Sequence, residues 1–322
     1  MSTMNATQEN DKPEVRWLEI TEENEDQRID NFLITLLKGV PKTRIYRIIR
    51  KGEVRVNKGR INNKYRLKIG DVVRVPPVRV AKRDSDIVLQ PTLKQSLEQD
   101  ILYEDDVLIV LNKPSGFAVH GGSGISSGVI EALRILRPEN RFLELAHRID
   151  KATSGCLLIA KKRSTLKALH ELFRTNVVKK TYLALLAGQW ERKKEIVTAP
   201  LLRNTGKGGE RVVKVSQAGK FAETSFRRIQ KYKDVTLVEA SPKTGRTHQI
   251  RVHAAWLGHP IVGDERYGDE KVNKQLKARG YKRLFLHAEQ LQFVHPVTSE
   301  MMHFKAPMSS ELQQQLDNEP VK

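Results

Sequence analysis

This 322-residue sequence has little cysteine, no long apolar run and no signal peptide, and each of these absences excludes a class of protein. The chain has one cysteine, Cys156, so it cannot form an intramolecular disulfide. Cys156 lies in an apolar run, where a small buried hydrophobic side chain is a better interpretation than a nucleophile. No apolar run is long enough to span a bilayer, and the polar N-terminal segment lacks the apolar stretch of a signal peptide. We therefore expect a cytoplasmic protein without a membrane partner.

Acidic residues are outnumbered by basic ones, with 57 Lys and Arg against 38 Asp and Glu and a formal net charge of +19. Such a surplus favours a polyanionic partner, most often nucleic acid, although a well-solvated basic surface would also produce it. A hydrophobic fraction of 39% suffices for a real core, and the length exceeds one average domain. The composition therefore predicts a folded two-domain protein that binds nucleic acid.

The N-terminal part predicts a compact unit over residues 17–80, after a polar and aperiodic tail at residues 1–16 that we expect to be disordered. Apolar residues at helical spacing indicate a first helix over residues 28–37. A second helix follows, and short strands are expected at residues 53–57 and 71–75. Two helices and a small sheet thus form one small α/β unit.

The second helix of this unit has an apolar stripe on one side and a basic face on the other. The basic face is formed by Arg44, Arg47, Arg50 and Lys51. With Arg28, Asp30, Leu33 and the run KGEVRVN at residues 51–57, it resembles the RNA-binding domain named after small-subunit ribosomal protein S-four. The resemblance implies that the basic helix rests on RNA phosphates and reads shape more than sequence. The alternative is an amphipathic helix with a solvated charged face.

A proline-containing stretch at residues 81–100 without apolar periodicity predicts a linker, and a larger domain is expected over residues 101–316. A glycine-rich run at residues 120–124 lacks the Lys-Ser/Thr ending of a phosphate loop and indicates a flexible turn. Residues 203–220, rich in Gly and Lys, predict a mobile basic hairpin loop. Apolar runs indicate strands near residues 107–111, 156–160, 179–187, 222–229, 235–240 and 284–287, and helices over residues 127–136 and from Ser164.

The loop HRIDKATSG at residues 147–155 leads directly into the apolar strand at residues 156–160. Asp150 therefore lies on a loop that is tied to core structure, which is a usual place for catalysis. An aspartate in such a turn often does no more than hydrogen-bond its own backbone. From these residues alone, both interpretations stay open.

A second motif, KTGRTHQIRVH, covers residues 243–253. Thr247 is placed to cap a helix that runs to Leu257, so Arg246 would stand at its N-terminal edge. His248 and His253 are five residues apart, which is not the one-face spacing of a helical zinc site, and no cysteine cluster accompanies them.

Two further classes of catalyst fit the Asp150 loop poorly. A glycosidase would need a second acid facing Asp150, and candidates such as Asp264 lie in no comparable motif. Ser154 lacks the glycine pattern of a nucleophile elbow and more plausibly fixes the loop backbone.

Taken together, the motifs of the larger domain are similar to those of the RluA family of pseudouridine synthases. The matching segments, in the family's order, are LNKPSG with VHGG at residues 111–122, HRIDKATSG at 147–155, TYLAL around Tyr182, GRTHQIRVH at 245–253 and RLFLHA at 283–288. The resemblance implies an α+β fold, in which a catalytic domain with a mixed, mainly antiparallel β-sheet follows the small N-terminal RNA-binding domain. Ile149 stands where leucine is commoner, a near-isosteric change.

The resemblance implies that a uridine is isomerised to pseudouridine, without a cofactor or metal. It makes Asp150 the aspartate that acts on a flipped-out nucleotide, and Arg246 the arginine that pairs with it and would lower the pKa of the acid. Tyr182 corresponds to the aromatic residue that packs on the uracil. Whether Asp150 attacks the sugar, adds to the ring or removes a ribose proton stays open.

Further residues follow from the same resemblance. Arg148 matches an arginine that fills the gap left by the flipped nucleotide. The apolar run from Leu284 to Leu286 is expected to wall the base pocket. We therefore expect a monomeric enzyme that modifies 23S ribosomal RNA or a large-subunit precursor and has no obligatory protein partner. The alternative is a non-catalytic RNA-binding factor of ribosome assembly.

Overall fold

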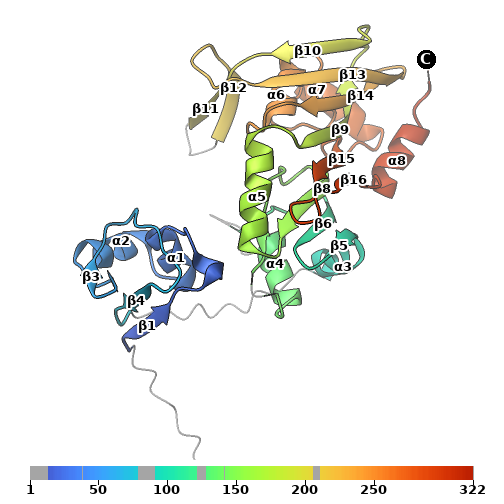
Figure 1. Ribbon diagram of the computed structural model, residues 1–322. Coiled ribbons are helices and arrows are strands. Elements are labelled where there is room, and N and C mark those ends of the chain that lie inside the picture. Colours follow the sequence, from blue (N-terminus) through green and yellow to red (C-terminus); the bar gives the residue numbers. More distant parts are fainter. Residues whose placement is uncertain are drawn as a thin grey trace, which may run out of the picture. The chain divides into compact units, whose positions relative to one another are not determined.

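The computed structural model describes residues 14–37, 39–78, 91–121, 128–140, 142–205 and 211–321. Their contacts divide the chain between residues 88 and 89 into two compact units (Figure 1). Each unit combines helices with a β-sheet, and the sheet of the larger unit is mixed and mainly antiparallel. The α+β fold class predicted from the sequence is thereby confirmed. Most of the expected glycine turn and the tip of the basic hairpin loop lie outside the described residues.

The N-terminal unit consists of two helices and a four-stranded sheet with the strand order β1-β4-β2-β3. Its elements are β1 (Arg16–Glu19), the 3-10 helix η1 (Glu22–Asn24), α1 (Ile29–Leu36), α2 (Lys42–Arg50), β2 (Arg55–Val56), β3 (Gly59–Arg60) and β4 (Val72–Val75). β1 pairs with β4 in antiparallel fashion. The unit therefore begins at Arg16, one residue inside the expected tail.

Helices α1 and α2 are held together by the apolar stripes that the sequence predicts. Ile29 and Leu33 of α1 and Ile45 and Ile48 of α2 are completely buried in one core. Burying side chains of this size stabilises a fold by roughly 1.5–3 kcal/mol each. The apolar side of α2 is thus committed to the core, and its basic side faces solvent.

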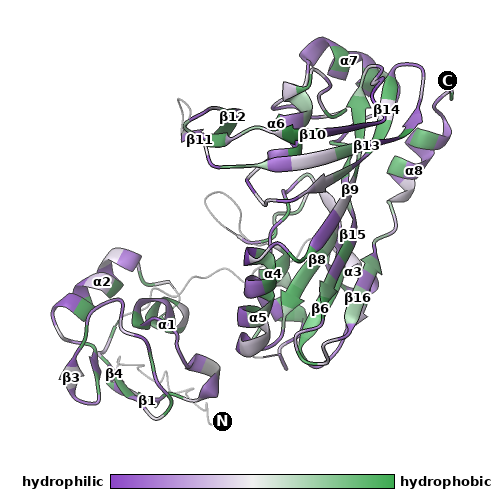
Figure 2. Cartoon of the chain, turned by 45° about the horizontal axis from the view of Figure 1, so that its top comes forward, coloured by the Kyte–Doolittle hydropathy of each residue, from purple (hydrophilic) through white to green (hydrophobic). Residues whose placement is uncertain are grey.

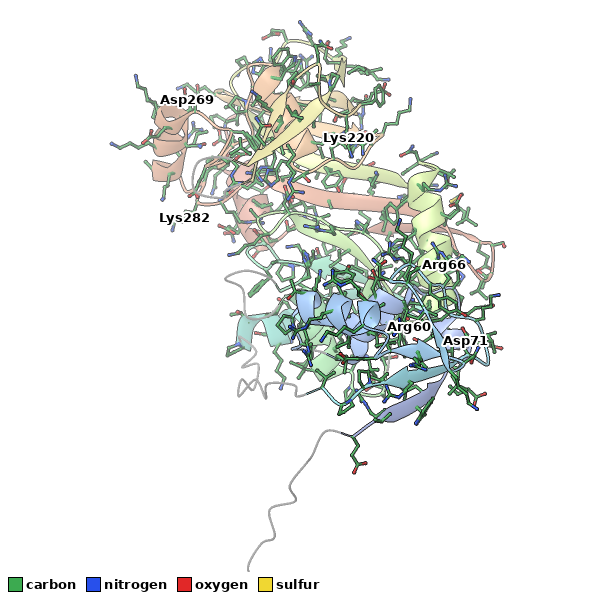
Figure 3. The ribbon with its side chains drawn as sticks, turned by 90° about the vertical axis from the view of Figure 1, so that its left-hand side faces the viewer. Arg60, Arg66, Asp71, Lys220, Asp269 and Lys282 are labelled. Carbon is green, nitrogen blue, oxygen red and sulfur yellow. The ribbon has the colours of Figure 1, made fainter. Side chains whose placement is uncertain are left out.

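Asp71, labelled in Figure 3, closes the small sheet through its buried carboxylate. The carboxylate accepts hydrogen bonds from the Asn57 side chain at 2.8 Å, the Tyr65 hydroxyl at 3.0 Å and the Lys68 backbone N–H at 2.9 Å. Asn57 and Lys58 both have positive φ, as a tight hairpin turn requires. One acidic side chain therefore ties the β2–β3 hairpin to the start of β4.

The larger unit is built on a ten-stranded sheet whose main path runs β10-β13-β14-β9-β15-β8-β6-β5, with β16 beside β15 and β7 beside β8. β15 and β8 are parallel, and the other neighbours are antiparallel. The strands are β5 (Ile101–Glu104), β6 (Leu108–Lys113), β7 (Glu144–Leu145), β8 (Ser154–Ala160), β9 (Lys179–Ala187), β10 (Lys194–Thr198), β13 (Glu223–Lys231), β14 (Val235–Pro242), β15 (Leu286–Val294) and β16 (Met301–Lys305). A separate hairpin pairs β11 (Leu201–Thr205) with β12 (Arg211–Val215).

Helices cover both faces of this sheet, so its central strands are buried on both sides. The helices are α3 (Pro91–Gln99), α4 (Val129–Leu136), α5 (Arg163–Arg174), α6 (Gln249–Trp256), α7 (Glu270–Ala278) and α8 (Ser310–Asp317). In β8, Leu157 packs toward α3 and α4, whereas Leu158 packs on the side of α5. This double burial explains why β8 is a continuous apolar run rather than an alternating one, as its hydrophobic colour in Figure 2 shows. Cys156 is part of this core.

Helix α3 lies inside the stretch at residues 81–100 that the sequence predicts to be a linker. Its two buried residues, Leu93 and Leu97, are one helical turn apart and pack into the core below α4. Residues 91–99 are therefore part of the larger unit, and the linker prediction is wrong for them. Two leucines in a polar nine-residue segment give too weak a periodicity to show a helix whose partners lie far along the chain.

Candidate active site

Asp150 lies on the loop between β7 and β8, and this loop is fixed to the segment that follows β6. The Gly116 N–H donates to the Lys151 carbonyl at 2.9 Å, and the Ser115 hydroxyl donates to the Ala152 carbonyl at 2.7 Å. The Asp150 side chain is 27% exposed, and its carboxylate accepts a hydrogen bond from an arginine. A simple turn-forming role does not explain this contact, because the carboxylate is directed at a cation.

Lys113, at the end of β6, holds the same loop from inside the protein. Its ammonium is completely buried and donates to the carbonyls of Pro114 at 2.7 Å, Phe117 at 3.0 Å and Lys151 at 3.3 Å. Burial lowers the pKa of Lys113 to about 7, although the charge of Asp150 acts in the opposite direction. Three carbonyl acceptors match the three protons of an ammonium. Nothing in the sequence indicates this role for the lysine of the LNKPSG motif.

The chain leaves the Asp150 loop through a close contact between β8 and β15. Gly155 has φ +109°, and a Cβ there would lie 2.3 Å from the Ala288 carbonyl oxygen. Next to it, the buried Ser154 hydroxyl lies 2.9 Å from Nδ1 of His287, whose Nε2 lies 3.0 Å from the Ala306 carbonyl. Because the carbonyl can only accept, Nε2 carries the imidazole proton and Ser154 donates to Nδ1. Ser154 therefore anchors the loop, as the sequence suggests.

The arginine that contacts Asp150 is Arg251, and the expectation that Arg246 pairs with it is wrong. Nη1 of Arg251 lies 3.3 Å from Oδ2 of Asp150. Arg246 is exposed, and its Nε donates to the Phe221 carbonyl at 3.0 Å. The physical reason is the placement of α6, which buries Arg251 within its first turn and leaves Arg246 on the turn before the helix.

Arg251 is itself held by the buried carboxylate of Asp264. Nε and Nη2 of Arg251 donate to the two carboxylate oxygens at 2.7 and 2.8 Å. Burial opposes ionisation of Asp264, but the hydrogen bonds and charge of Arg251 outweigh it and lower the pKa of Asp264. The guanidinium also lies over the Tyr267 ring, 5.1 Å from its centroid. Asp264 and Tyr267 thus orient Arg251 toward Asp150.

Helix α6 starts after His248, so the expected cap at Thr247 is wrong. His248 has φ +54° and ψ +21°, in the left-handed region that side chains rarely adopt, and it makes no side-chain capping bond. Gln249 instead fixes the turn before the helix, because its side-chain oxygen accepts from the Arg246 N–H at 3.0 Å and from the Thr244 hydroxyl. This start places His248 and Arg251 together beside Asp150.

Tyr182, Leu284 and Leu286 share one hydrophobic cluster. Tyr182 lies on β9 and packs partly buried against the core that contains both leucines. Burial raises the pKa of Tyr182, and the negative charge of Asp150 raises it further, so the phenol stays neutral. Leu284 and Leu286 are each 3% exposed. The structure therefore places the predicted aromatic ring where the charge of Asp150 acts on it, and both predicted leucines in the core against which that ring packs. That the leucines wall a base pocket stays a prediction.

The basic residues expected to bind RNA have their charged groups available. Arg148 is exposed next to Asp150, and Arg47, Arg50 and Lys51 are exposed on or just after α2, whereas Arg44 is half-buried. Within the described ranges, none of these five side chains forms an ion pair or a hydrogen bond with the protein. Cations that are free of protein carboxylates can contact phosphates directly.

The histidines of the second motif are engaged in protein contacts. His253 is buried between the Thr224 hydroxyl at 2.9 Å and the Ala199 carbonyl at 3.0 Å. Over the residues that the structure describes, no three His, Cys, Asp or Glu side chains gather in a way that could hold a metal ion.

Among the described residues, no helix is long and apolar enough to cross a membrane.

An aspartate that contacts an arginine beside a mixed sheet, in a chain that also carries a unit with a basic helix, suits an enzyme that modifies RNA, and comparison with known families shows this class. The RNA pseudouridylate synthase family matches residues 107–256, and the S4 domain matches residues 27–73. With the relatives described next, these matches show that the chain belongs to the RNA pseudouridylate synthase family. The resemblance found in the sequence is confirmed.

Relatives of this family resemble the chain over nearly its whole length. The ribosomal large subunit pseudouridine synthase C of Escherichia coli K12 is 58% identical over 304 residues, which cover 93% of this chain and 95% of the relative. The Haemophilus ducreyi protein of the same name is 55% identical over 308 residues, covering 95% and 96%. Among solved structures, human RNA pseudouridylate synthase domain containing 4 is 28% identical with a TM-score of 0.58, covering 70% of this chain and 95% of that one.

Proposed function

We propose that this protein isomerises specific uridines of large-subunit (23S) ribosomal RNA to pseudouridine, with Asp150 acting on a nucleotide flipped out of its stack. Family membership supports the reaction, and the names of the relatives support the large-subunit substrate. The assignment of Asp150 rests on its carboxylate, which is partly exposed and is contacted by Arg251. The loop that carries Asp150 is fixed by Lys113.

The reaction exchanges one bond of the base for another. The bond between ribose C1′ and N1 of uracil breaks, a bond between C1′ and C5 forms, the C5 proton leaves and N1 gains a proton. Attack on the sugar, addition to the ring and removal of a ribose proton all require an ionised carboxylate at Asp150. Arg251 places its positive charge beside that carboxylate and donates a hydrogen bond to it. Because Asp264 already neutralises and orients Arg251, the guanidinium can do this without moving.

The groups around Asp150 suit a flipped nucleotide. Tyr182 presents a neutral aromatic ring for packing on uracil while the glycosidic bond is broken. Arg148 is free to enter the gap that the nucleotide leaves, where a planar guanidinium can stack and hydrogen-bond. Unstacking a nucleotide costs a few kcal/mol, and such an insertion offsets part of that cost. The basic face of α2 would hold the surrounding RNA through phosphates.

A variant that keeps the shape of Asp150 and removes its charge tests this proposal. We expect Asp150→Asn to bind a large-subunit RNA fragment as wild type does and to lose pseudouridine formation by about three orders of magnitude or more. Asp234→Asn is the matched control, because Asp234 is half-exposed in an ion pair with Arg279. Equal product from Asp150→Asn and wild type would remove Asp150 from the mechanism. Binding without product in wild type as well would favour a non-catalytic assembly factor.

We also propose that the enzyme works as a monomer in the cytoplasm. The same assay tests a further part of the proposal, which is that the enzyme needs no cofactor, metal or obligatory protein partner. Purified protein and transcribed RNA alone, with a chelator present, are expected to give full conversion. A requirement for an added factor or cell extract would contradict this part and leave the role of Asp150 intact.

A further inference from the structure

We propose that Tyr267 fixes the proton of His248 on Nε2, and that His248 thereby acts as a positioning residue whose N–H faces the Asp150 carboxylate. This inference rests on the proposed function, because it concerns the same carboxylate. It adds two residues to which the sequence analysis assigned no role.

The geometry places His248 between a hydroxyl and a carboxylate. Nδ1 of His248 lies 2.7 Å from the Tyr267 hydroxyl oxygen, and Nε2 lies 3.9 Å from Oδ2 of Asp150. The rings of His248 and Tyr267 meet edge to face, with centroids 5.5 Å apart. The two ring nitrogens therefore face different partners, so the position of the single proton of a neutral imidazole decides what Asp150 meets.

A third group determines where that proton lies. The Val213 backbone N–H donates to the Tyr267 hydroxyl oxygen at 3.2 Å. Apart from this bond, the hydroxyl oxygen meets only Nδ1 of His248 among the described residues, so Nδ1 is the acceptor for the hydroxyl proton. The imidazole proton is consequently on Nε2. The opposite tautomer would leave the hydroxyl proton without a described acceptor and would aim the Nε2 lone pair at the negative charge of Asp150.

Burial keeps the imidazole of His248 neutral, which is the condition for a tautomer to matter. Burial lowers the pKa of His248, and the positive charges of Arg251 and Arg266 lower it further, while Asp150 and Asp264 act in the opposite direction. The net shift is downward. At neutral pH the ring therefore carries one proton rather than two.

Tyr267 contacts both groups that present N–H donors to Asp150. Its hydroxyl meets His248, and its ring lies under the Arg251 guanidinium. Through Val213, Tyr267 is also joined to β12 of the β11–β12 hairpin. The contact chain from the hairpin to the carboxylate thus runs through one tyrosine and one histidine.

Side-chain NMR of protein labelled with ¹⁵N-histidine tests the tautomer without any enzyme assay. The His248 signal is identified by its loss in His248→Asn. We expect wild type to show the proton on Nε2 and Tyr267→Phe to show a mixture of both tautomers, because the hydroxyl that enforces one of them is gone. A wild-type proton on Nδ1, or an unchanged tautomer in Tyr267→Phe, would overturn the proposal.

Two substitutions of His248 separate its two nitrogens in single-turnover assays. The amide N–H of His248→Gln can replace Nε2–H toward Asp150, whereas the oxygen of His248→Asn can replace only the Nδ1 acceptor for Tyr267. Asparagine also tolerates the left-handed backbone at this position. We expect the Asn variant to lose about 100-fold in the rate of product formation, and the Gln variant to recover most of it, with RNA affinity unchanged in both.

The positioning role is overturned if both variants react at the wild-type rate. It is also overturned if the rates of both variants fall by the same amount. Thermal melting that matches wild type shows that the variants are folded. Asp150→Asn, assayed in parallel, distinguishes failure of the proposed function from failure of the role proposed for His248. If Asp150→Asn remains active, the proposed function fails, whereas an inactive Asp150→Asn beside fully active His248 variants leaves that function standing and removes His248 from it.

Discussion

Asp264 binds Arg251 with both carboxylate oxygens, at 2.7 and 2.8 Å, and thereby leaves Nη1 of Arg251 directed at Asp150. The Asp264 side chain is fully buried, and that of Arg251 is 11% exposed. The pair is thus an internal support for a carboxylate that must itself stay accessible. A support of this kind orients the group that stabilises charge before the substrate arrives.

Removing the charge of Asp264 should therefore damage catalysis and stability together. Loss of one partner of a buried ion pair costs about 3–5 kcal/mol, because the other charge stays buried. We expect Asp264→Asn to lower the free energy of unfolding by a few kcal/mol and the rate of pseudouridine formation by about 100-fold, as urea unfolding and single-turnover assays would measure.

The matched control is Asp269→Asn, since Asp269 (Figure 3) caps α7 through the Val272 N–H and belongs to no part of the site. That variant should cost about 1 kcal/mol or less and leave the rate unchanged. A fully active Asp264→Asn protein would show that Arg251 needs no support.

Lys113 gives the unfolding free energy a pH dependence whose sign follows from its lowered pKa. In the folded protein the pKa is about 7, and its ordinary value is 10.5. Between these values the unfolded chain holds a proton that the folded protein has released, so stability rises with pH across this window, by at most about 5 kcal/mol. Below pH 7 both states are protonated and the contribution is constant.

We expect Lys113→Met to remove this rise, as urea unfolding at several pH values between 7 and 10 would show. The variant should be less stable than wild type at every pH, because the carbonyls of Pro114, Phe117 and Lys151 lose their shared donor. Lys220→Met, at an exposed position, is the control and should leave the slope as it is. A wild-type slope that persists in Lys113→Met would assign it to another group.

The sequence predicts the two helices of the N-terminal unit and the Asp150 loop because each has a local signal. Apolar stripes mark α1 and α2, and a polar run that stops at a buried strand marks the loop. No such signal distinguishes Arg251 from Arg246. Six consecutive residues of α6, Gln249 to Ala254, are buried, so the helix has no polar face whose period would show which arginine points inward.

The rest of the site depends on contacts between distant segments. Asp264 meets Arg251 after a turn that no spacing rule predicts, and Lys113 finds its third carbonyl 38 residues further along the chain. The left-handed conformation of His248 lets α6 begin at Gln249, two residues beyond Thr247, and no residue pattern before the helix marks that start. Sequence motifs therefore locate this site, but tertiary structure decides which of their residues meet.

The basic face of α2 predicts how RNA affinity depends on salt concentration, and not which RNA sequence is preferred. Arg47 and Arg50 are exposed and have no protein partner in the described residues, so each can neutralise one phosphate and release its counterions. We expect Arg47→Gln with Arg50→Gln to weaken binding to all large-subunit RNA fragments alike. The slope of log K against log salt should fall by about 0.7 per lost contact, as filter binding at several salt concentrations would measure. Arg66→Gln is the control, because Arg66 is already paired with Asp26 at 3.1 Å. An unchanged slope in the double variant would place the RNA on another surface.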